Sequence, residues 1–353
     1  MAKQTTAALG GATETDSREP STHSARPRSR LKVGDLFNRY ALLVAWALLI
    51  VIFAVTEGDT FFTPRNFTSS IFGSQSVLVV LAFSLVVTLT AGDYDLSAAA
   101  TLSLSAMVVA VLNVKHGVPL GYALVAALLI GALVGAFNGF LILWIGIESL
   151  IATLATGTLV AGVVLWLSDG LTVTGVSSTL TELVIVPRVK GMPLSFFYAL
   201  ALAALLWYFL KYTPVGRRLL FVGRGRKVSR LSGLRVDRLR WGALIVGGVL
   251  AALAGILYVG TSGAADADSG ATFLLPAFAA AFLGSTSIVP GRFNAWGTFA
   301  AVYFLGTGIN GLSLLGIQVF VQNLFYGGAL IIGVSLSILV GRRRNRDKEA
   351  VVE

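Results

Sequence analysis

The sequence predicts an all-α polytopic membrane protein with about ten transmembrane helices. Hydrophobic residues make up 56% of the 353 residues and charged residues only 12%, whereas soluble proteins carry about 25% charged residues. From Tyr40 onward, charge-free apolar runs alternate with short polar breaks, and a run of about 20 residues crosses the hydrocarbon core as a helix. The positive charges gather in three blocks outside these runs. Together these observations predict one membrane domain, residues 39–340, between two tails.

The first 38 residues are predicted to be a disordered cytoplasmic tail. They are rich in Ala, Thr, Ser, Arg and Pro without apolar periodicity, so they cannot bury enough surface to offset the entropy of ordering. A cleavable signal peptide is not indicated, because the first apolar run begins some 40 residues into the chain. Leu31–Arg39 could form a short interfacial helix.

Ten apolar runs have the length of a membrane span, and none contains a charged residue. The eighth is short and carries Pro276, and the fourth is long enough to tilt or to end in the interface. The ten runs are Tyr40–Thr56, Phe67–Thr90, Leu96–Val114, Val118–Trp144, Leu150–Ser168, Leu194–Leu210, Trp241–Thr261, Phe273–Val289, Phe293–Ile309 and Gly316–Val340.

Charge asymmetry predicts the orientation. Residues 211–240 are the longest hydrophilic stretch between spans and carry ten Lys or Arg against one acid, Asp237. Ten spans place this segment on the same side as both tails, which gives 23 of the 27 basic residues to that side. The positive-inside rule makes this side cytoplasmic, with the basic C-terminal tail, residues 341–353, also inside. A nucleic-acid footprint is disfavoured, because the charges are not spread over one folded face.

The longest outer loop, residues 169–193, has two possible structures. Its segment Asp169–Val186 is rich in Thr, Ser and Val, so this segment either holds a short ordered cap or remains a solvated loop.

The polar residues inside the spans suggest a path for a neutral polar solute. Asp95 precedes the third span, where it can cap a helix or line a solute path at a helix break. With Asp93 it could also hold Mg²⁺ for an intramembrane transferase, although the chain offers no further carboxylate at membrane depth. The remaining candidates are uncharged, which argues against ion coupling. The predicted path residues are Asp95, Ser97, Asn138, Thr153, Thr156, Ser285, Thr286, Ser287 and Asn310.

Small residues and one repeated dipeptide bear on helix packing. Gly131-x-x-x-Gly135 and the pairs Gly247-Gly248 and Gly327-Gly328 predict close helix crossings. Asn138-Gly139 in the fourth span and Asn310-Gly311 after the ninth hint that spans two to five and seven to ten are inverted repeats.

No motif indicates catalysis or a cofactor. The chain has no GxxxxGK[ST], HExxH or GxSxG and no Cys. We therefore expect no enzyme activity, no metal and no bound ATP in this chain.

Four stretches resemble the permease subunits of ribose-type bacterial ATP-binding-cassette sugar importers, in the branched-chain and ribose permease superfamily. Thr90–Ser97 is similar to the family pattern TGGIDLS, and Asn138-Gly139 with Ile151–Leu154 is similar to NG…FIVTLGT. Residues 216–234 resemble GR…iG…AARLSGI. Ala279–Arg292 with Asn310–Leu312 resembles AAVVLGGTSLxGGxG…NGL.

The chain departs from this pattern at several positions. Asp93-Tyr94 replaces Gly-Ile, Lys227 stands where an acid is common, and Arg224 and Arg226 add charge. Glu148-Ser149 and Val289-Pro290 also differ. These departures affect the expected substrate more than the expected architecture.

The resemblance implies a multi-pass bacterial plasma-membrane permease that works by alternating access. Its expected partners are an ATP-binding ATPase subunit inside, a solute-binding protein outside, membrane lipid and a second permease copy, with no nucleic acid. The expected solute is a monosaccharide or similar small polar molecule. Leu219, Leu220, Val222, Val228, Leu231 and Leu234, interleaved with Arg, predict short amphipathic helices that dock on the ATPase. The predicted coupling residues are Gly216, Arg217, Gly223, Arg230, Leu231, Ser232 and Gly233.

Two rival functions remain open at this point. A secondary carrier or channel would move the solute without an ATPase. An intramembrane enzyme would use Asp93 and Asp95 with a metal.

Overall fold

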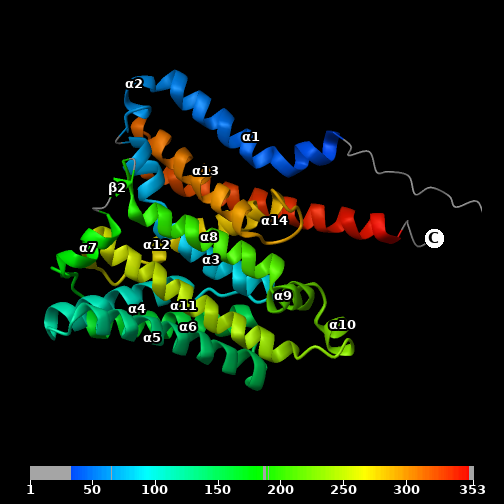
Figure 1. Ribbon diagram of the computed structural model, residues 1–353, viewed down its shortest axis with the longest axis horizontal. Helices are drawn as coiled ribbons and strands as arrows, with labels where there is room; N and C mark the ends of the chain where they lie inside the picture. Colours follow the sequence, from blue (N-terminus) through cyan, green and yellow to red (C-terminus); the bar gives the residue numbers. More distant parts are fainter. Residues whose placement is uncertain (1–32, 65, 186–187, 190, 350–353) are drawn as a thin grey trace, which may run out of the picture.

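The computed structural model describes residues 33–64, 66–185, 188–189 and 191–349, and in it long helices run side by side along one direction (Figure 1). Every one of the ten predicted spans is helical. Their helices are α1 (Val33–Thr56), η1 with α3 (Asn66–Gly73, Ser76–Thr90), α4 with η2 (Ala98–Ala110, Val111–Lys115), α5 with η3 (Leu120–Phe140, Leu141–Ile145), α6 (Ser149–Ser168), α8 (Leu194–Tyr212), α11 (Val236–Ser262), α12 (Ala271–Thr286), α13 (Ala295–Leu314) and α14 (Val319–Glu349).

Eight of these helices are long and apolar enough to cross a membrane. The two others are α12, a shorter apolar helix of 16 residues, and α13, which has 20 residues. Gly, Thr and Asn residues lower the hydropathy of α13. The predicted eighth span is also shorter than expected, because α12 ends at Thr286 and not at Val289.

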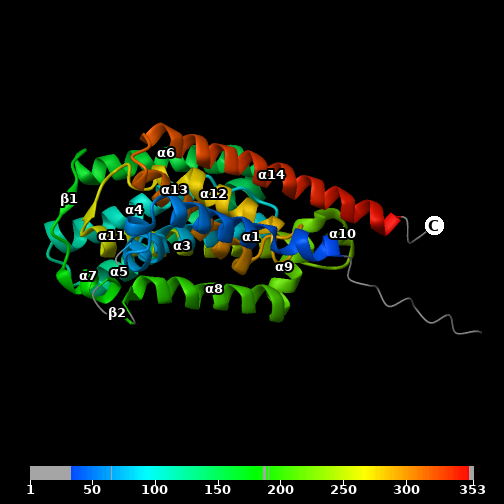
Figure 2. The same cartoon turned by 90° about the horizontal axis from the view of Figure 1, so that it is seen from above.

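The bundle has two ends, which we name from their residues. The arginine-rich end carries residues 211–240, with the short helices α9 (Pro214–Arg224) and α10 (Arg226–Leu231). The start of α1 and the end of α14 lie at this same end (Figures 1 and 2), as an even number of spans requires. Of the interfacial helix predicted at Leu31–Arg39, residues 31 and 32 lie outside the described residues, and from Val33 the chain is already the first turns of α1.

The opposite end, the cap end, holds the described residues of the segment 169–193 together with residues 263–270. The described part of 169–193 forms an ordered cap: β1 (Val173–Thr174), α7 (Ser178–Val184), β2 (Arg188–Val189) and β3 (Met192–Pro193). β1 pairs antiparallel with β4 (Ala264–Ala265), and β2 pairs with β3. The short helix α2 (Gly58–Phe61) lies at this end too (Figure 1).

The buried centre of the bundle is built from α3, α4, α11 and α12, whose residues dominate the core. α3 is buried along nearly its whole length, whereas α1 and α14 are mostly exposed. Figure 2 shows α6 and α14 along one side of the bundle and α8 along the other. Because apolar side chains on these outer helices are exposed, such as Leu159 and Ile331, they are suited to contact lipid.

Glycines allow α5 and α11 to cross closely, as the sequence predicted. A Cβ on Gly131 would lie 2.5 Å from the Gly248 carbonyl oxygen, and one on Gly135 would overlap the Leu244 carbonyl. Gly327-Gly328 makes no close crossing with another described helix of this chain, because a Cβ added at either glycine would have no neighbour within 4 Å.

The helix contacts agree with two inverted repeats. α4 packs against α5 and α6, and α12 packs against α13 and α14 in the same way. Likewise α11 contacts α5, and its counterpart α3 contacts α13. The central pair α3 and α11 pack on each other, so the two halves meet along these helices.

Candidate functional site

The candidate site is centred on the break between α3 and α4, residues 91–97. Gly92 has φ +83°, a backbone conformation that glycine adopts without the steric cost of a side chain. Beyond this turn the chain runs through Asp93, Tyr94 and Asp95 before α4 begins. Asp93 and Asp95 are both fully buried, while Tyr94 is exposed.

Two arginines hold the Asp93 carboxylate. Arg240, in the first turns of α11, donates from Nε to Oδ2 at 2.8 Å and from Nη2 to Oδ1 at 2.6 Å. Arg226, at the start of α10, donates from Nη2 to Oδ1 at 2.9 Å and to the Gly92 carbonyl. The Arg240 side chain is buried, whereas 43% of the Arg226 side chain is exposed. A buried carboxylate is costly unless it is paired, so the two guanidinium groups explain how Asp93 stays in the interior.

Asp95 has a different set of partners. Its Oδ1 accepts from the Ser97 backbone N–H at 3.0 Å and from Ser97 Oγ at 2.6 Å. Ser97 Oγ in turn accepts from Asn138 Nδ2 of α5 at 2.8 Å. The predicted path residues Asp95, Ser97 and Asn138 therefore form one buried hydrogen-bonded chain.

The break is also tied to α6. Ser149 Oγ accepts from the Tyr94 backbone N–H at 3.2 Å, and Thr153 Oγ1 accepts from the Leu96 N–H at 3.0 Å. These bonds satisfy backbone donors that the interrupted helix leaves open. Thr153 thus joins the same network as Asp95.

Three buried polar atoms around this network have no hydrogen-bond partner. They are Ser84 Oγ of α3, Asn138 Oδ1 of α5 and Thr156 Oγ1 of α6. Within the part of the chain that the structure describes, buried polar groups of this kind are few. Buried polar groups normally have a hydrogen-bond partner, so these three atoms leave hydrogen-bonding capacity unused around the Asp95 network.

The other predicted path residues lie elsewhere. Ser285 Oγ donates to the Phe282 carbonyl and lies 3.0 Å from Ser337 Oγ of α14. Ser287 Oγ donates to the Arg39 carbonyl of α1. Asn310 exchanges two hydrogen bonds with Asn66, at 2.9 and 3.0 Å, between α13 and η1. These contacts link α12 and α13 of the second half to α14, α1 and η1, and they do not bring these residues together with Asp95.

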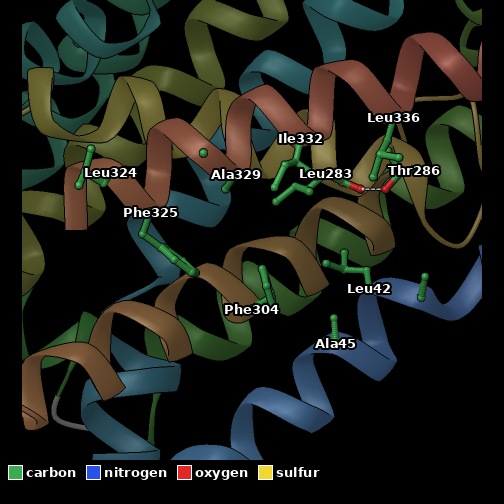
Figure 3. A pocket seen from close by; sticks show the side chains of 12 residues that line it. Leu42, Ala45, Leu283, Thr286, Phe304, Leu324, Phe325, Ala329, Ile332 and Leu336 are labelled. Atoms are coloured by element: carbon green, nitrogen blue, oxygen red, sulfur yellow. Dashed lines mark hydrogen bonds between the residues drawn. The ribbon is translucent and has the colours of Figure 1, made fainter. Parts of the chain in front are cut away.

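Thr286 lines an apolar pocket of about 400 Å³ between α1, α12, α13 and α14 (Figure 3). Leu42, Leu283 and Phe304 point into the same space. The Thr286 hydroxyl is bonded to the Leu283 carbonyl, so it offers the pocket little polarity. This pocket suits an acyl chain or a neighbouring helix better than a polar solute.

The predicted coupling segment forms α9 and α10 at the arginine-rich end. Thr213 caps α9 by accepting from the Gly216 N–H at 3.0 Å, with Pro214 in the first turn. Two glycines fit α9 against its neighbours: a Cβ on Gly216 would overlap the Phe209 carbonyl, and one on Gly223 would overlap the carbonyl oxygen of Thr90. Gly223 therefore places α9 directly on the end of α3, beside Asp93.

The apolar surface of this segment differs from the prediction. Leu219 and Val222 are buried against the bundle and are not presented to a partner, because α9 uses one apolar face to pack on the neighbouring helices. The exposed apolar side chains of α9 and α10 are Val215, Phe221, Val228 and Leu231, and Leu231 is 83% exposed. The exposed apolar surface of this segment is thus formed by α10 and the outer face of α9.

The remaining coupling residues surround this apolar surface. Arg217, Ser232 and Gly233 are exposed, and Gly233 turns the chain with φ +77°. Arg230 is also exposed and pairs with Asp237 at 2.7 Å.

At the cap end, a second helix break lies between α11 and α12. Asp266 Oδ2 accepts from Thr172 Oγ1 at 2.7 Å, and its Oδ1 accepts from the Asp268 N–H at 2.9 Å. The hydrogen bond from the Thr172 hydroxyl lowers the pKa of Asp266 most, and the bond from the Asp268 N–H lowers it further. Lys115 pairs with Asp169 in the same region at 3.1 Å.

Sequence reasoning missed the pairing of Asp93 with Arg226 and Arg240, and the pairing of Asn66 with Asn310. A signal for the first was present: Asp93 and Arg226 are both departures from the family pattern, and in the structure they contact each other. The pairing also removes the basis for a metal site at Asp93 and Asp95, because the Asp93 oxygens are occupied by guanidinium groups.

Comparison with known proteins gives a consistent result. Residues 67–334 match the family model described as branched-chain amino acid transport system / permease component. The chain is 30% identical to the D-allose transport system permease protein AlsC of Escherichia coli K12, over 87% of this chain and 93% of that protein. It is 27% identical to the ribose import permease protein RbsC of Haemophilus influenzae, over 90% and 98%.

A third relative is the autoinducer 2 import system permease protein LsrD of Photorhabdus laumondii, 32% identical over 85% of this chain and 92% of that protein. No solved structure matches the chain.

Proposed function

Because this chain belongs to the family of branched-chain amino acid transport system permease components, we propose that it imports a monosaccharide or similar small polar solute by alternating access. A separate ATPase docks at the arginine-rich end and drives the cycle. A solute-binding protein delivers the solute at the cap end. In this arrangement residues 39–340 are the permease domain, residues 211–240 are its coupling loop, and the tails 1–38 and 341–353 are cytoplasmic.

One observation carries this proposal: an exposed apolar surface on α9 and α10 is attached to a buried break in a central helix. Phe221, Val228 and Leu231 provide apolar area within a basic border, which suits a protein partner with an acidic rim. Arg226 and Gly223 join that surface to residues 90–93. Movement of a docked ATPase would therefore reach the polar network around Asp95 through direct contacts.

The polar network supports an uncharged solute. Around Asp95 it offers hydroxyl and amide groups from Ser97, Asn138, Thr153 and Thr156, which are the groups that hydrogen-bond a sugar hydroxyl. The names of two relatives specify sugars, allose and ribose, and agree with this interpretation.

Transport can be tested in liposomes that contain the chain with its ATPase and binding protein. We expect accumulation of radiolabelled D-ribose or D-allose that requires ATP, and none of L-leucine. Liposomes with this chain alone should show no flux. ATP-independent flux would favour a stand-alone carrier, and leucine uptake would refute the proposed solute class.

The orientation can be tested separately, because the chain has no Cys. Leu231→Cys on α10 and Leu171→Cys in the cap are both at exposed positions. In intact cells a membrane-impermeant maleimide should label Leu171→Cys only, and Leu231→Cys should react after permeabilisation. The reverse pattern would contradict a cytoplasmic coupling loop.

We also propose that the permease is a homodimer in contact with lipid in the bacterial plasma membrane. The exposed apolar faces of α1 and α14 and the pocket between them support a lipid or helix neighbour. A further pocket of about 340 Å³ at the arginine-rich end, lined by Trp144, Trp241 and Arg238, suits a lipid headgroup. Mass measurement of the protein in nanodiscs should give two chains.

A further inference from the structure

The Asp93 carboxylate joins three elements, of which α10 and α11 are also linked by the exposed pair Arg230–Asp237. It lies in the break after α3, Arg240 belongs to α11, and Arg226 belongs to α10. Both guanidinium groups donate to the carboxylate oxygens within 2.9 Å. A shift of α10 cannot leave this carboxylate behind without breaking a charge-assisted bond, which is stronger than a hydrogen bond between neutral groups.

The two arginines have different roles in this contact. Arg240 is buried, binds both carboxylate oxygens and comes from a central helix. It compensates the buried charge. Arg226 binds one oxygen, is partly exposed and comes from the short docking helix. Its second bond from Nη2, to the Gly92 carbonyl, fixes it to the backbone at the turn.

From Asp93 the contacts continue into the polar network. The next residues, Tyr94 and Leu96, are bonded through their N–H groups to Ser149 and Thr153 of α6. Ser97 is bonded to Asn138 of α5. Displacement of Asp93 therefore moves a segment whose hydrogen bonds hold two further helices.

We propose that Asp93 is the positioning residue through which the docking helices α9 and α10 move the α3–α4 break, with Arg226 as the link. This inference rests on the proposed function and specifies how the ATPase is coupled to the solute site. Gly223 lets α9 pack on Thr90 at the same place. Packing resists only the approach of α9 to the break, whereas the ion pair with Asp93 also resists separation.

The test compares two charge-removing variants on the same helix. Arg226→Gln removes the link to Asp93. Lys227→Gln removes one positive charge from the next, exposed position, so any loss of long-range attraction to the ATPase appears in both variants. The measurement is the number of ATP molecules hydrolysed per solute molecule transported by the permease–ATPase complex, with loaded binding protein present.

We expect Arg226→Gln to raise the ATP cost per solute about tenfold, a typical size for coupling between sites, while the ATPase still copurifies. Lys227→Gln should keep the wild-type ratio. Arg226→Lys should restore most of the coupling, because one ammonium group can replace the single nitrogen that binds Asp93. A merely structural role of Arg226 would lower the yield of complex without changing this ratio.

Equal ratios in Arg226→Gln and Lys227→Gln would overturn the inference. A wild-type complex that transports no solute with ATP would instead refute the proposed function, so the two failures are distinguishable.

Discussion

The two helix breaks of this protein share a local design but differ in their surroundings. The α3–α4 break turns at Gly92 and the α11–α12 break at Gly263, both with positive φ. Each contains two aspartates two residues apart, and each has an aspartate that accepts from the backbone two residues on: Asp95 Oδ1 accepts from the Ser97 N–H, and Asp266 Oδ1 accepts from the Asp268 N–H.

The surroundings give these similar turns opposite properties. At the arginine-rich end the aspartates are buried, and Asp93 is held by Arg226 and Arg240. At the cap end Asp268 is exposed and Asp266 is bonded to Thr172 of a surface loop. The comparison indicates that the first break is joined to α10 and α11 through a buried carboxylate, whereas the aspartates of the second break lie at the surface and its buried anchor is a backbone bond, from the Gly270 N–H to Ser103 Oγ.

The largest expected effect comes from removing the buried charge partner, with Arg240→Met. The loss of this guanidinium leaves Asp93 paired only with the partly exposed Arg226, and breaking a buried pair costs about 3–5 kcal/mol. We expect a clearly lower thermal unfolding midpoint for the protein in detergent. The control Arg238→Met lies two residues away on the same helix and is exposed, so it should unfold like the wild type.

The double variant Asp93→Leu/Arg240→Met sharpens this test. It removes both buried charges, so it should recover much of the lost stability. If Arg240→Met and Arg238→Met unfold alike, the buried ion pair does not stabilise the first break.

A smaller effect is expected from Gly223→Ala. The added methyl group would overlap the Thr90 carbonyl oxygen, so α9 must move away from the end of α3. Overpacking of this kind costs about 1–3 kcal/mol. The control Gly242→Ala, on α11, has open space around the new methyl, and it corrects for the helix propensity gained by alanine.

Thermal unfolding in detergent again provides the measurement, together with recovery of the ATPase in a pull-down. Gly223→Ala should have a lower unfolding midpoint and a lower recovery of the ATPase than Gly242→Ala. Identical behaviour of the two variants would mean that α9 is not seated on the break as described.

The sequence predicted the membrane architecture well because that part depends on local composition. Runs of apolar residues identify spans wherever they occur, and Gly131 and Gly135 predicted the crossing of α5 with α11. The break at Asp95 was also foreseen, since charged residues interrupt an apolar run there.

Contacts between distant residues were not predictable in this way. Asp93 and Arg240 are 147 positions apart, and nothing local to either residue specifies the other. The same holds for Asn66 and Asn310. Which face of α9 packs inward depends on how the segment lies against α3, so Leu219 and Val222 could not be distinguished from Leu231 by their hydrophobicity alone.

The smallest effect concerns the second break, with Thr172→Val. The Thr172 hydroxyl stabilises the charged form of Asp266 and lowers its pKa, so this bond contributes above the unfolded-state pKa and is lost as pH falls through the lower folded-state pKa. The variant should therefore raise the pKa of Asp266. Because the site is at the surface, global stability should change by less than about 0.5 kcal/mol.

Hydrogen exchange of residues 263–270 provides the measurement at the second break. At neutral pH, Thr172→Val should exchange faster there than Thr174→Val, which alters an exposed threonine of β1 two residues away. The difference should shrink at a pH below the lowered pKa of Asp266, where protonation weakens the bond in the reference protein as well. A difference that persists unchanged in acid would show that Thr172 holds this break through packing and not through the carboxylate, and the contrast between the two breaks would then rest on burial alone.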